Sequence, residues 1–115
     1  MEFTIELYET PNGQPVVEEE ELDGIERTIP VLYDLLLAGL SKLRRREYHQ
    51  PPLCEPLGGG LFELRVGRKN IARAIWFFQM GQQIVVVRCF VKKSQKTPPG
   101  ELELARKRMA EYLDR

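Results

Sequence analysis

The residues best suited to do chemistry are arginines and lysines in the stretch between Glu63 and Glu101, which contains no acidic residue. They are Arg65, Arg68, Lys69, Arg73, Arg88, Lys92, Lys93 and Lys96. Like charges in one segment repel one another, and a polyanionic partner such as a nucleic acid is the usual compensation. Arginine can hold two phosphate oxygens at once, which makes phosphate chemistry the first expectation.

Cleavage of RNA without a metal sets three chemical requirements. The ribose 2′-OH must be deprotonated, the pentacoordinate phosphorane must be stabilised, and the 5′-oxygen must be protonated as it leaves. Preorganised cations supply the stabilisation, and a lysine packed among other cations can have a lowered pKa and act as a base. The cationic stretch is therefore compatible with such a reaction.

An alternative is that these cations are neutralised inside the fold. Residues 1–34 contain ten acidic residues and one basic residue, whereas residues 35–115 contain sixteen basic and seven acidic residues. The acidic half could pair with the basic half, and Arg65 in particular could pair with a carboxylate. Arg88, between Val87 and Cys89, is expected to be structural or to face a partner. The single histidine, His49, is a weak candidate base, since nothing places it near Arg73.

The first half of the chain predicts one strand and two helices. Residues 3–8 alternate apolar and polar side chains, as a half-buried strand does. A first helix is expected from Pro15, with the acidic run 18–21 in its first turns. Thr28 is expected to cap a second helix, with Pro30 in its first turn. Its apolar stripe consists of Leu32, Leu35, Leu36, Leu40 and Leu43.

The second half predicts a three-stranded meander and a last helix. Residues 50–60, rich in proline and glycine, are expected to form a loop. Strands are predicted over 61–66, 71–79 and 83–90, with a hairpin turn at residues 67–70. Lys92–Lys96 is expected to be a basic loop, and the segment 97–99 to open the final helix.

These elements predict an α+β fold with the order β-α-α-β-β-β-α, in a single domain over residues 1–115. The helices are expected to pack on one face of a mostly antiparallel sheet and to leave the opposite face open. Arg65 lies on the polar face of its strand with Glu63. If the meander pairs as predicted, Arg65 and Arg73 could meet Lys92, Lys93 and Lys96 on the open face.

Composition excludes several classes of protein. No apolar run is long enough for a membrane helix, and the N-terminus does not resemble a signal peptide, so a cytoplasmic protein is expected. Cys54 and Cys89 match no metal-ligand spacing and are expected to be free thiols. Residues 58–60 are not followed by a lysine and a helix, so they form no P-loop. No metal or organic cofactor is implied.

Three motifs resemble the RelE/ParE toxin superfamily, and specifically its HigB-like, phage-associated branch. They are Leu57-Gly-Gly-Gly-Leu-Phe-Glu-Leu-Arg65, Ala72-Arg-Ala-Ile-Trp-Phe-Phe78, and Phe90-Val-Lys-Lys-Ser-Gln-Lys-Thr-Pro98 running into the final helix. The resemblance implies a barnase-like toxin fold and ribosome-dependent cleavage of mRNA. It also implies a cognate antitoxin, which in this branch usually has a helix-turn-helix domain.

The resemblance also suggests roles for individual residues. Arg73 stands at the position of the superfamily's phosphate-contacting arginine, and Lys93 matches a basic position at the end of the last strand that is functional in close relatives. Lys92 and Lys96 match lysines of the HigB branch. The expected catalytic residues are therefore Arg73, Lys93, Lys96 and Arg65, and the expected RNA-binding residues are Lys92, Arg68 and Lys69.

The chain departs from the family pattern at several positions. The lysines that RelE has on the strand of Leu61 and Glu63 are missing, and Thr97-Pro98-Pro99 offers no equivalent of its C-terminal tyrosine. Glu21 replaces a large apolar residue, so the first helix could dock differently. Two further readings stay open: a ParE-like inhibitor that poisons a topoisomerase without nuclease activity, or a non-catalytic protein that binds antitoxin or RNA.

Overall fold

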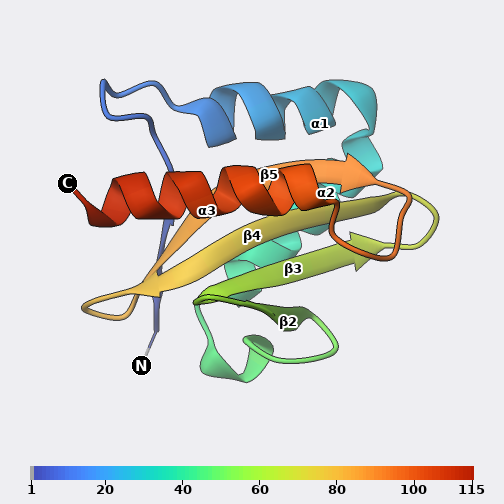
Figure 1. The fold of residues 1–115 in the computed structure, drawn as a ribbon. Coiled ribbons are helices and arrows are strands. Elements are labelled where there is room, and N and C mark those ends of the chain that lie inside the picture. Colours follow the sequence, from blue (N-terminus) through green and yellow to red (C-terminus); the bar gives the residue numbers. More distant parts are fainter. Residues whose placement is uncertain (1) are drawn as a thin grey trace.

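A computed structural model describes residues 2–115 and contains one five-stranded sheet with three α-helices (Figure 1). The strands are β1 (Thr4–Leu7), β2 (Cys54–Gly58), β3 (Leu61–Gly67), β4 (Ile71–Gln79) and β5 (Gln83–Lys92). The helices are α1 (Asp23–Thr28), α2 (Pro30–Lys42) and α3 (Pro99–Leu113), with a π-helical segment η1 (Val16–Leu22) and a short 3₁₀ turn η2 (Arg46–Tyr48). The α+β class is confirmed.

The sheet has the order β1-β5-β4-β3-β2, and its pairs are antiparallel except for β1 and β5, which are parallel. β1 pairs only with the first half of β5, from Gln83 to Val86. Beyond that point, the Glu21 side chain accepts a hydrogen bond of 2.8 Å from the Cys89 N–H. Glu21 thus continues the edge of β5 where the strand partner ends.

The predicted meander is confirmed, but the predicted loop over residues 50–60 is only partly correct. Cys54–Gly58 forms the additional strand β2, which pairs with β3, so the order is β-α-α-β-β-β-β-α. Glycines make this hairpin possible, since Gly59 and Gly60 connect the strands with φ values of 64° and 89°. Pro56 is tolerated because β2 lies at the edge of the sheet.

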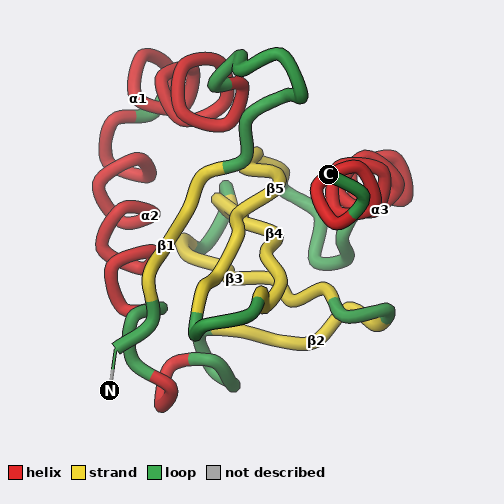
Figure 2. The backbone as a smooth tube through the Cα atoms, turned by 90° about the vertical axis from the view of Figure 1, so that its left-hand side faces the viewer, coloured by secondary structure: helices red, strands yellow, loops and turns green. Residues whose placement is uncertain are grey.

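The expectation that all helices cover one face is wrong. Figure 2 shows α2 and α3 on opposite sides of the sheet. On one face, Gly39 allows α2 to approach β3 so closely that an added Cβ would lie 3.1 Å from Leu64. On the other face, the Tyr112 ring of α3 lies 5.8 Å from the Phe77 ring. The face expected to be open is partly covered, because the chain crosses over it after β5.

Two details of the predicted helices also differ. Thr28 does not cap α2: its hydroxyl donates to the carbonyl of Gly24 within α1, and Ile29 holds the N-cap position. Leu35, expected in the buried stripe, is 45% exposed, whereas Leu32, Leu36, Leu40 and Leu43 are buried. The helix therefore turns a narrower apolar stripe to the sheet than its leucine content suggests.

Candidate functional site

Arg65 and Arg73 are brought together as the strand pattern predicts. They are direct cross-strand partners in the β3–β4 pair, so their side chains leave the same face of the sheet. Each guanidinium reaches the loop that follows β5. Arg65 Nη2 donates to the carbonyl of Gln95 at 2.5 Å, while Arg73 donates from Nη1 to Lys96 at 3.0 Å and from Nη2 to Ser94. The two arginines thus hold three consecutive carbonyls of the basic loop.

Arg73 is fully buried in this arrangement. Burial lowers the pKa of its guanidinium, and the nearby Glu63 carboxylate opposes that effect. Its Nε has no hydrogen-bond partner among the residues that the structure describes. The guanidinium has no surface open to a phosphate here, so the contact that the resemblance implies for Arg73 is not formed in this conformation. Its observed contacts position the loop.

Glu63 is a second anchor of the loop that the sequence did not single out. Its carboxylate is buried, accepts a hydrogen bond of 2.5 Å from the Thr97 hydroxyl, and lies 3.4 Å from Arg65 Nε. The sequence indicates only that Glu63 and Arg65, two residues apart, share one face of their strand. This alternation does not predict the contact with Thr97, because Thr97 follows β5 and two strands, β4 and β5, lie between the two residues along the chain.

The lysines at the end of β5 and in the loop that follows it are exposed to solvent. Lys92, Lys93 and Lys96 are exposed, and so are Arg68 and Lys69 in the β3–β4 turn. Register places the two groups together, because Ile71, which follows the turn, pairs with Lys92. Figure 1 shows this turn and the loop after β5 at the same end of the sheet. Within residues 2–115 none of these five cations has a carboxylate within 4.0 Å. We call them the cationic patch.

Arg88 is neutralised instead. It forms ion pairs with Glu101 at 2.8 Å and Glu21 at 3.0 Å, and Glu21 also pairs with Arg108 at 2.6 Å. Burial alone lowers the pKa of Arg88, but its hydrogen bonds to Glu101 and Glu21 outweigh that effect and raise it. Arg88 therefore has structural contacts, as one of the two expectations for it holds. The pairs of Glu21 with Arg88 and Arg108 also show that the acidic N-terminal segment neutralises part of the basic half.

His49 lies among aromatic rings and makes no contact with Arg73. Its ring packs against Phe3, Trp76 and Phe78 at centroid distances of 4.8–5.3 Å. Its Nε2 lies 2.6 Å from the carbonyl oxygen of Leu43. These contacts tie the segment after α2 to the sheet.

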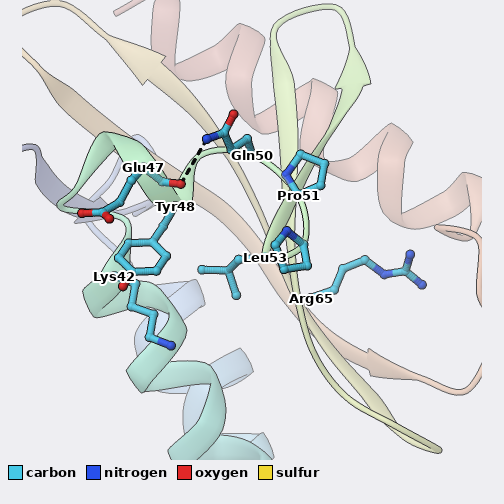
Figure 3. Close-up of a pocket in the computed structure, with 8 residues that line it drawn as sticks. Lys42, Glu47, Tyr48, Gln50, Pro51, Leu53 and Arg65 are labelled. Carbon is cyan, nitrogen blue, oxygen red and sulfur yellow. Dashed lines mark hydrogen bonds between the residues drawn. The ribbon is translucent and has the colours of Figure 1, made fainter.

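Two pockets lie at the margins of the site. A pocket of about 420 Å³ is formed by residues of the segment 42–53 and by Arg65. Figure 3 shows that the Arg65 guanidinium points away from Lys42, Tyr48 and Leu53, so no set of polar groups converges there. A second pocket of about 500 Å³ extends from Lys92 along β5 between α1 and α3, and the Glu21, Arg88 and Glu101 network lines it.

The described part of the chain offers neither a metal cluster nor a membrane span. No three or more histidine, cysteine or acidic side chains of residues 2–115 are grouped to hold a metal ion. None of the helices in this range is both long and apolar enough to cross a bilayer.

Comparison with known proteins identifies one family. The family model described as "Phage derived protein Gp49-like (DUF891)" matches residues 20–110, which is most of the chain. Comparison with curated proteins gives no match. The match includes β2 to β5, most of α3 and therefore the whole cationic patch. The chain belongs to the Gp49-like family of phage-derived proteins, a RelE/ParE-like family of toxins from toxin–antitoxin systems.

Proposed function

We propose that this protein is the toxin of a toxin–antitoxin system and cleaves mRNA on the ribosome without a metal. The observation that carries the proposal is the cationic patch: five exposed cations with no carboxylate of residues 2–115 within 4.0 Å, at the end of the sheet where Ile71 pairs with Lys92. Unpaired cations held on a preorganised support suit a phosphodiester better than cations already neutralised. The proposal places the protein in the cytoplasm, where mRNA is translated.

In the proposed reaction the ribose 2′-oxygen attacks the adjacent phosphorus and the bond from phosphorus to the 5′-oxygen breaks. The products are a 2′,3′-cyclic phosphate and a free 5′-OH, and one proton moves from the 2′-OH to the leaving oxygen. Lys93 and Lys96 stabilise the negative charge of the phosphorane. Lys92, Arg68 and Lys69 bind the flanking phosphates, which fixes the position of the strand.

Arg65 and Arg73 enter this mechanism differently from what the resemblance implies. We assign Arg73 the role of a positioning residue, because its two Nη atoms donate hydrogen bonds to the backbone carbonyl oxygens of Lys96 and Ser94. Arg65 holds Gln95 in the same way, but its side chain is 25% exposed and can also approach an RNA phosphate. Glu63 completes the support through Thr97.

The test is primer-extension mapping of mRNA with purified protein and translating ribosomes. Wild-type protein should produce cuts in phase with codons. A Lys93→Ala, Lys96→Ala variant should lose about a hundred-fold in cleavage rate, as expected when charge stabilisation is removed from a transition state. Lys107→Ala is the matched control, since Lys107 is an exposed lysine of α3 away from the loop, and it should cut normally.

Two other outcomes would replace this proposal. Intact transcripts together with arrested DNA replication in cells expressing the protein would indicate a ParE-like topoisomerase poison. Intact transcripts without any growth arrest, from a protein that still binds RNA or antitoxin, would indicate a non-catalytic relative.

A further inference from the structure

A second group of cations lies at the C-terminal end of α2, and the proposed reaction does not use it. It consists of four exposed basic residues within five positions, Lys42, Arg44, Arg45 and Arg46. Among residues 2–115 their one ion pair joins Arg45 to Glu47 at 3.8 Å, and the two side chains are 66% and 64% exposed. Such an exposed pair neutralises little, so the group favours a polyanionic ligand.

This second group lies far from the cationic patch. Arg46 shares a pocket with Gln82 of the β4–β5 turn. Figure 1 shows that turn at the end of the sheet opposite the β3–β4 turn and the loop after β5. β4 runs from Ile71, which pairs with Lys92, to Gln79 beside the turn, and its nine residues span about 26 Å at the usual rise of a strand. One nucleotide therefore cannot contact both groups of cations.

Phe78 supplies an aromatic surface beside the second group. Its ring is 42% exposed, whereas Trp76 and Phe77 before it in β4 are buried. Four neighbouring rings hold it at centroid distances of 5.0–5.8 Å, namely those of Phe3, His49, Phe62 and Trp76. An exposed ring on such a rigid support is a platform on which an unpaired base can stack.

Two pockets share Arg46 and Gln82. One has a volume of about 360 Å³ and is lined by Phe3, Arg46, Phe78, Gln79 and Gln82. The other has a volume of about 390 Å³ and is lined by Glu2, Arg45, Arg46, Glu47 and Gln82. The first pocket thus combines an aromatic face with two side-chain amides, and the second combines two guanidinium groups with two carboxylates.

These groups match the parts of one nucleotide. The side-chain amides of Gln79 and Gln82 carry donors and acceptors suited to the edge of a base that stacks on Phe78. The Arg46 guanidinium lies over the Phe3 ring at 5.8 Å, which fixes it in the same pocket, and it can hold two phosphate oxygens. Because Glu47 opposes a phosphate in the second pocket, Arg46 is the cation best placed to bind one.

We propose that Arg45, Arg46, Phe78, Gln79 and Gln82 form a second RNA site, which binds an unpaired nucleotide of single-stranded RNA. Phe78 stacks on the base, the two amides bind the base edge, and Arg46 binds the phosphate with added charge from Arg45. We call these five residues the nucleotide site. That the RNA belongs to a translating ribosome rests on the proposed function, whereas the nucleotide site does not.

The test is an NMR titration with a hexanucleotide of 2′-O-methyl RNA, whose blocked 2′-oxygen prevents cleavage. The amide signals of Gln79, Met80 and Gln82 should shift as one set, with an affinity separate from that of residues 92–96. Phe78→Leu keeps an apolar side chain but removes the ring, and should weaken binding at this set at least about five-fold. Phe78→Tyr keeps the ring and should stay within about two-fold of wild type.

Charge gives an independent measurement. Arg45→Gln and Arg46→Gln together should weaken binding at the same set of amides at least about ten-fold, and should make the slope of log K against log salt shallower by about 1.4. Arg106→Gln is the matched control, since Arg106 is an exposed arginine of α3, and it should change neither quantity.

Two results would overturn the proposal. The first is a titration in which signals shift at residues 92–96 but not at Gln79, Met80 and Gln82, or in which Phe78→Leu and the double arginine variant both bind as wild type does. The second is a set of signals that responds to the small protein encoded beside this gene but not to the hexanucleotide, which would make this surface a protein interface.

Ribosomes distinguish two sources of the nucleotide. Weaker binding of Phe78→Leu to ribosomes without mRNA would assign it to ribosomal RNA, and weaker binding only after mRNA is loaded would assign it to the message. Failure of the two proposals is also distinguishable. A protein that binds the hexanucleotide at the nucleotide site but never cuts mRNA keeps this site and removes the nuclease, and a protein that cuts mRNA without any response at this site does the opposite.

Discussion

The buried guanidinium of Arg73 donates a hydrogen bond of 3.0 Å to the carbonyl oxygen of Lys96, while the Lys96 side chain remains exposed. A residue without solvent access thus fixes the main chain of a residue whose side-chain charge is open to solvent. The two residues therefore differ in role: Lys96 presents a charge to solvent, and Arg73 fixes the backbone of the loop that contains Lys96.

Replacement of Arg73 tests this separation. Arg73→Met keeps a long apolar side chain in the core and removes a buried charge, so we expect the free energy of unfolding to fall by at most about 2 kcal/mol. Digestion by trypsin after Lys93 and Lys96 should become at least about ten-fold faster, because the free energy of opening this loop falls by more than about 1.4 kcal/mol. Cleavage of mRNA should fall with it. Lost mRNA cleavage with unchanged digestion of this loop would show that Arg73 contacts the phosphate directly.

The Thr97–Glu63 hydrogen bond gives a second test of the loop support. Thr97→Val removes the donor at 2.5 Å from a buried carboxylate, which should cost about 1.5–3 kcal/mol of unfolding free energy. Thr97→Ser keeps the hydroxyl and should restore most of that stability. Denaturant unfolding of the two variants measures the difference, and equal stability would show that the hydrogen bond contributes nothing.

The salt dependence of RNA binding counts the cations that touch phosphates. For single-stranded RNA, the slope of log K against log salt concentration is about −0.7 for each phosphate contact. Loss of Lys93 and Lys96 together should therefore make the slope shallower by about 1.4. Lys107→Ala should leave it unchanged. Fluorescence anisotropy with a short RNA over a salt series makes this measurement.

Glu21 should be the carboxylate to which stability is most sensitive. It binds Arg88, Arg108 and the Cys89 N–H, and its side chain is only 7% exposed. Glu21→Ala leaves two cations without their shared partner and should cost about 3–5 kcal/mol. Glu21→Gln keeps an acceptor and should cost less. Glu20→Ala, at the exposed neighbouring position, is the control and should change stability by less than about 0.5 kcal/mol.

The two cysteines should be unreactive in the folded protein. Burial raises the pKa of Cys54 to about 11 and raises that of Cys89 as well. At pH 8 the thiolate fraction of Cys54 is then about a hundred-fold below that of an ordinary thiol of pKa 9.0, and only the thiolate reacts. Both thiols should alkylate slowly with iodoacetamide until denaturant unfolds the chain. As pH rises from 9 toward 11, the unfolded state ionises first, so stability should fall over that range.

Local pattern predicted much of the sheet and part of the site. The alternation along residues 61–66 and 71–79 and the turn at 67–70 place Arg65 and Arg73 on one face, and the structure confirms it. Such predictions succeed because the period of two and the hairpin turn depend on neighbouring residues alone. Leu35 is exposed although it belongs to the predicted apolar stripe of α2. Periodicity predicts which residues share a helix face, but the width of the buried part of that face depends on the sheet that packs against it.

By itself, the sequence determined the element types, the strand parity and the unbalanced block of positive charge. Only the tertiary structure decided that α3 lies on the face opposite α2 and that the loop after β5 lies over Arg73. It also decided that Arg88 pairs with Glu21, whereas Lys92, Lys93 and Lys96 have no carboxylate of residues 2–115 within 4.0 Å. The physical reason is the distance along the chain. Arg73 and its carbonyl partners are separated by 21 and 23 residues, and Arg88 and Glu21 by many more. Whether a charge is buried, paired or free depends on segments that only the folded chain brings together.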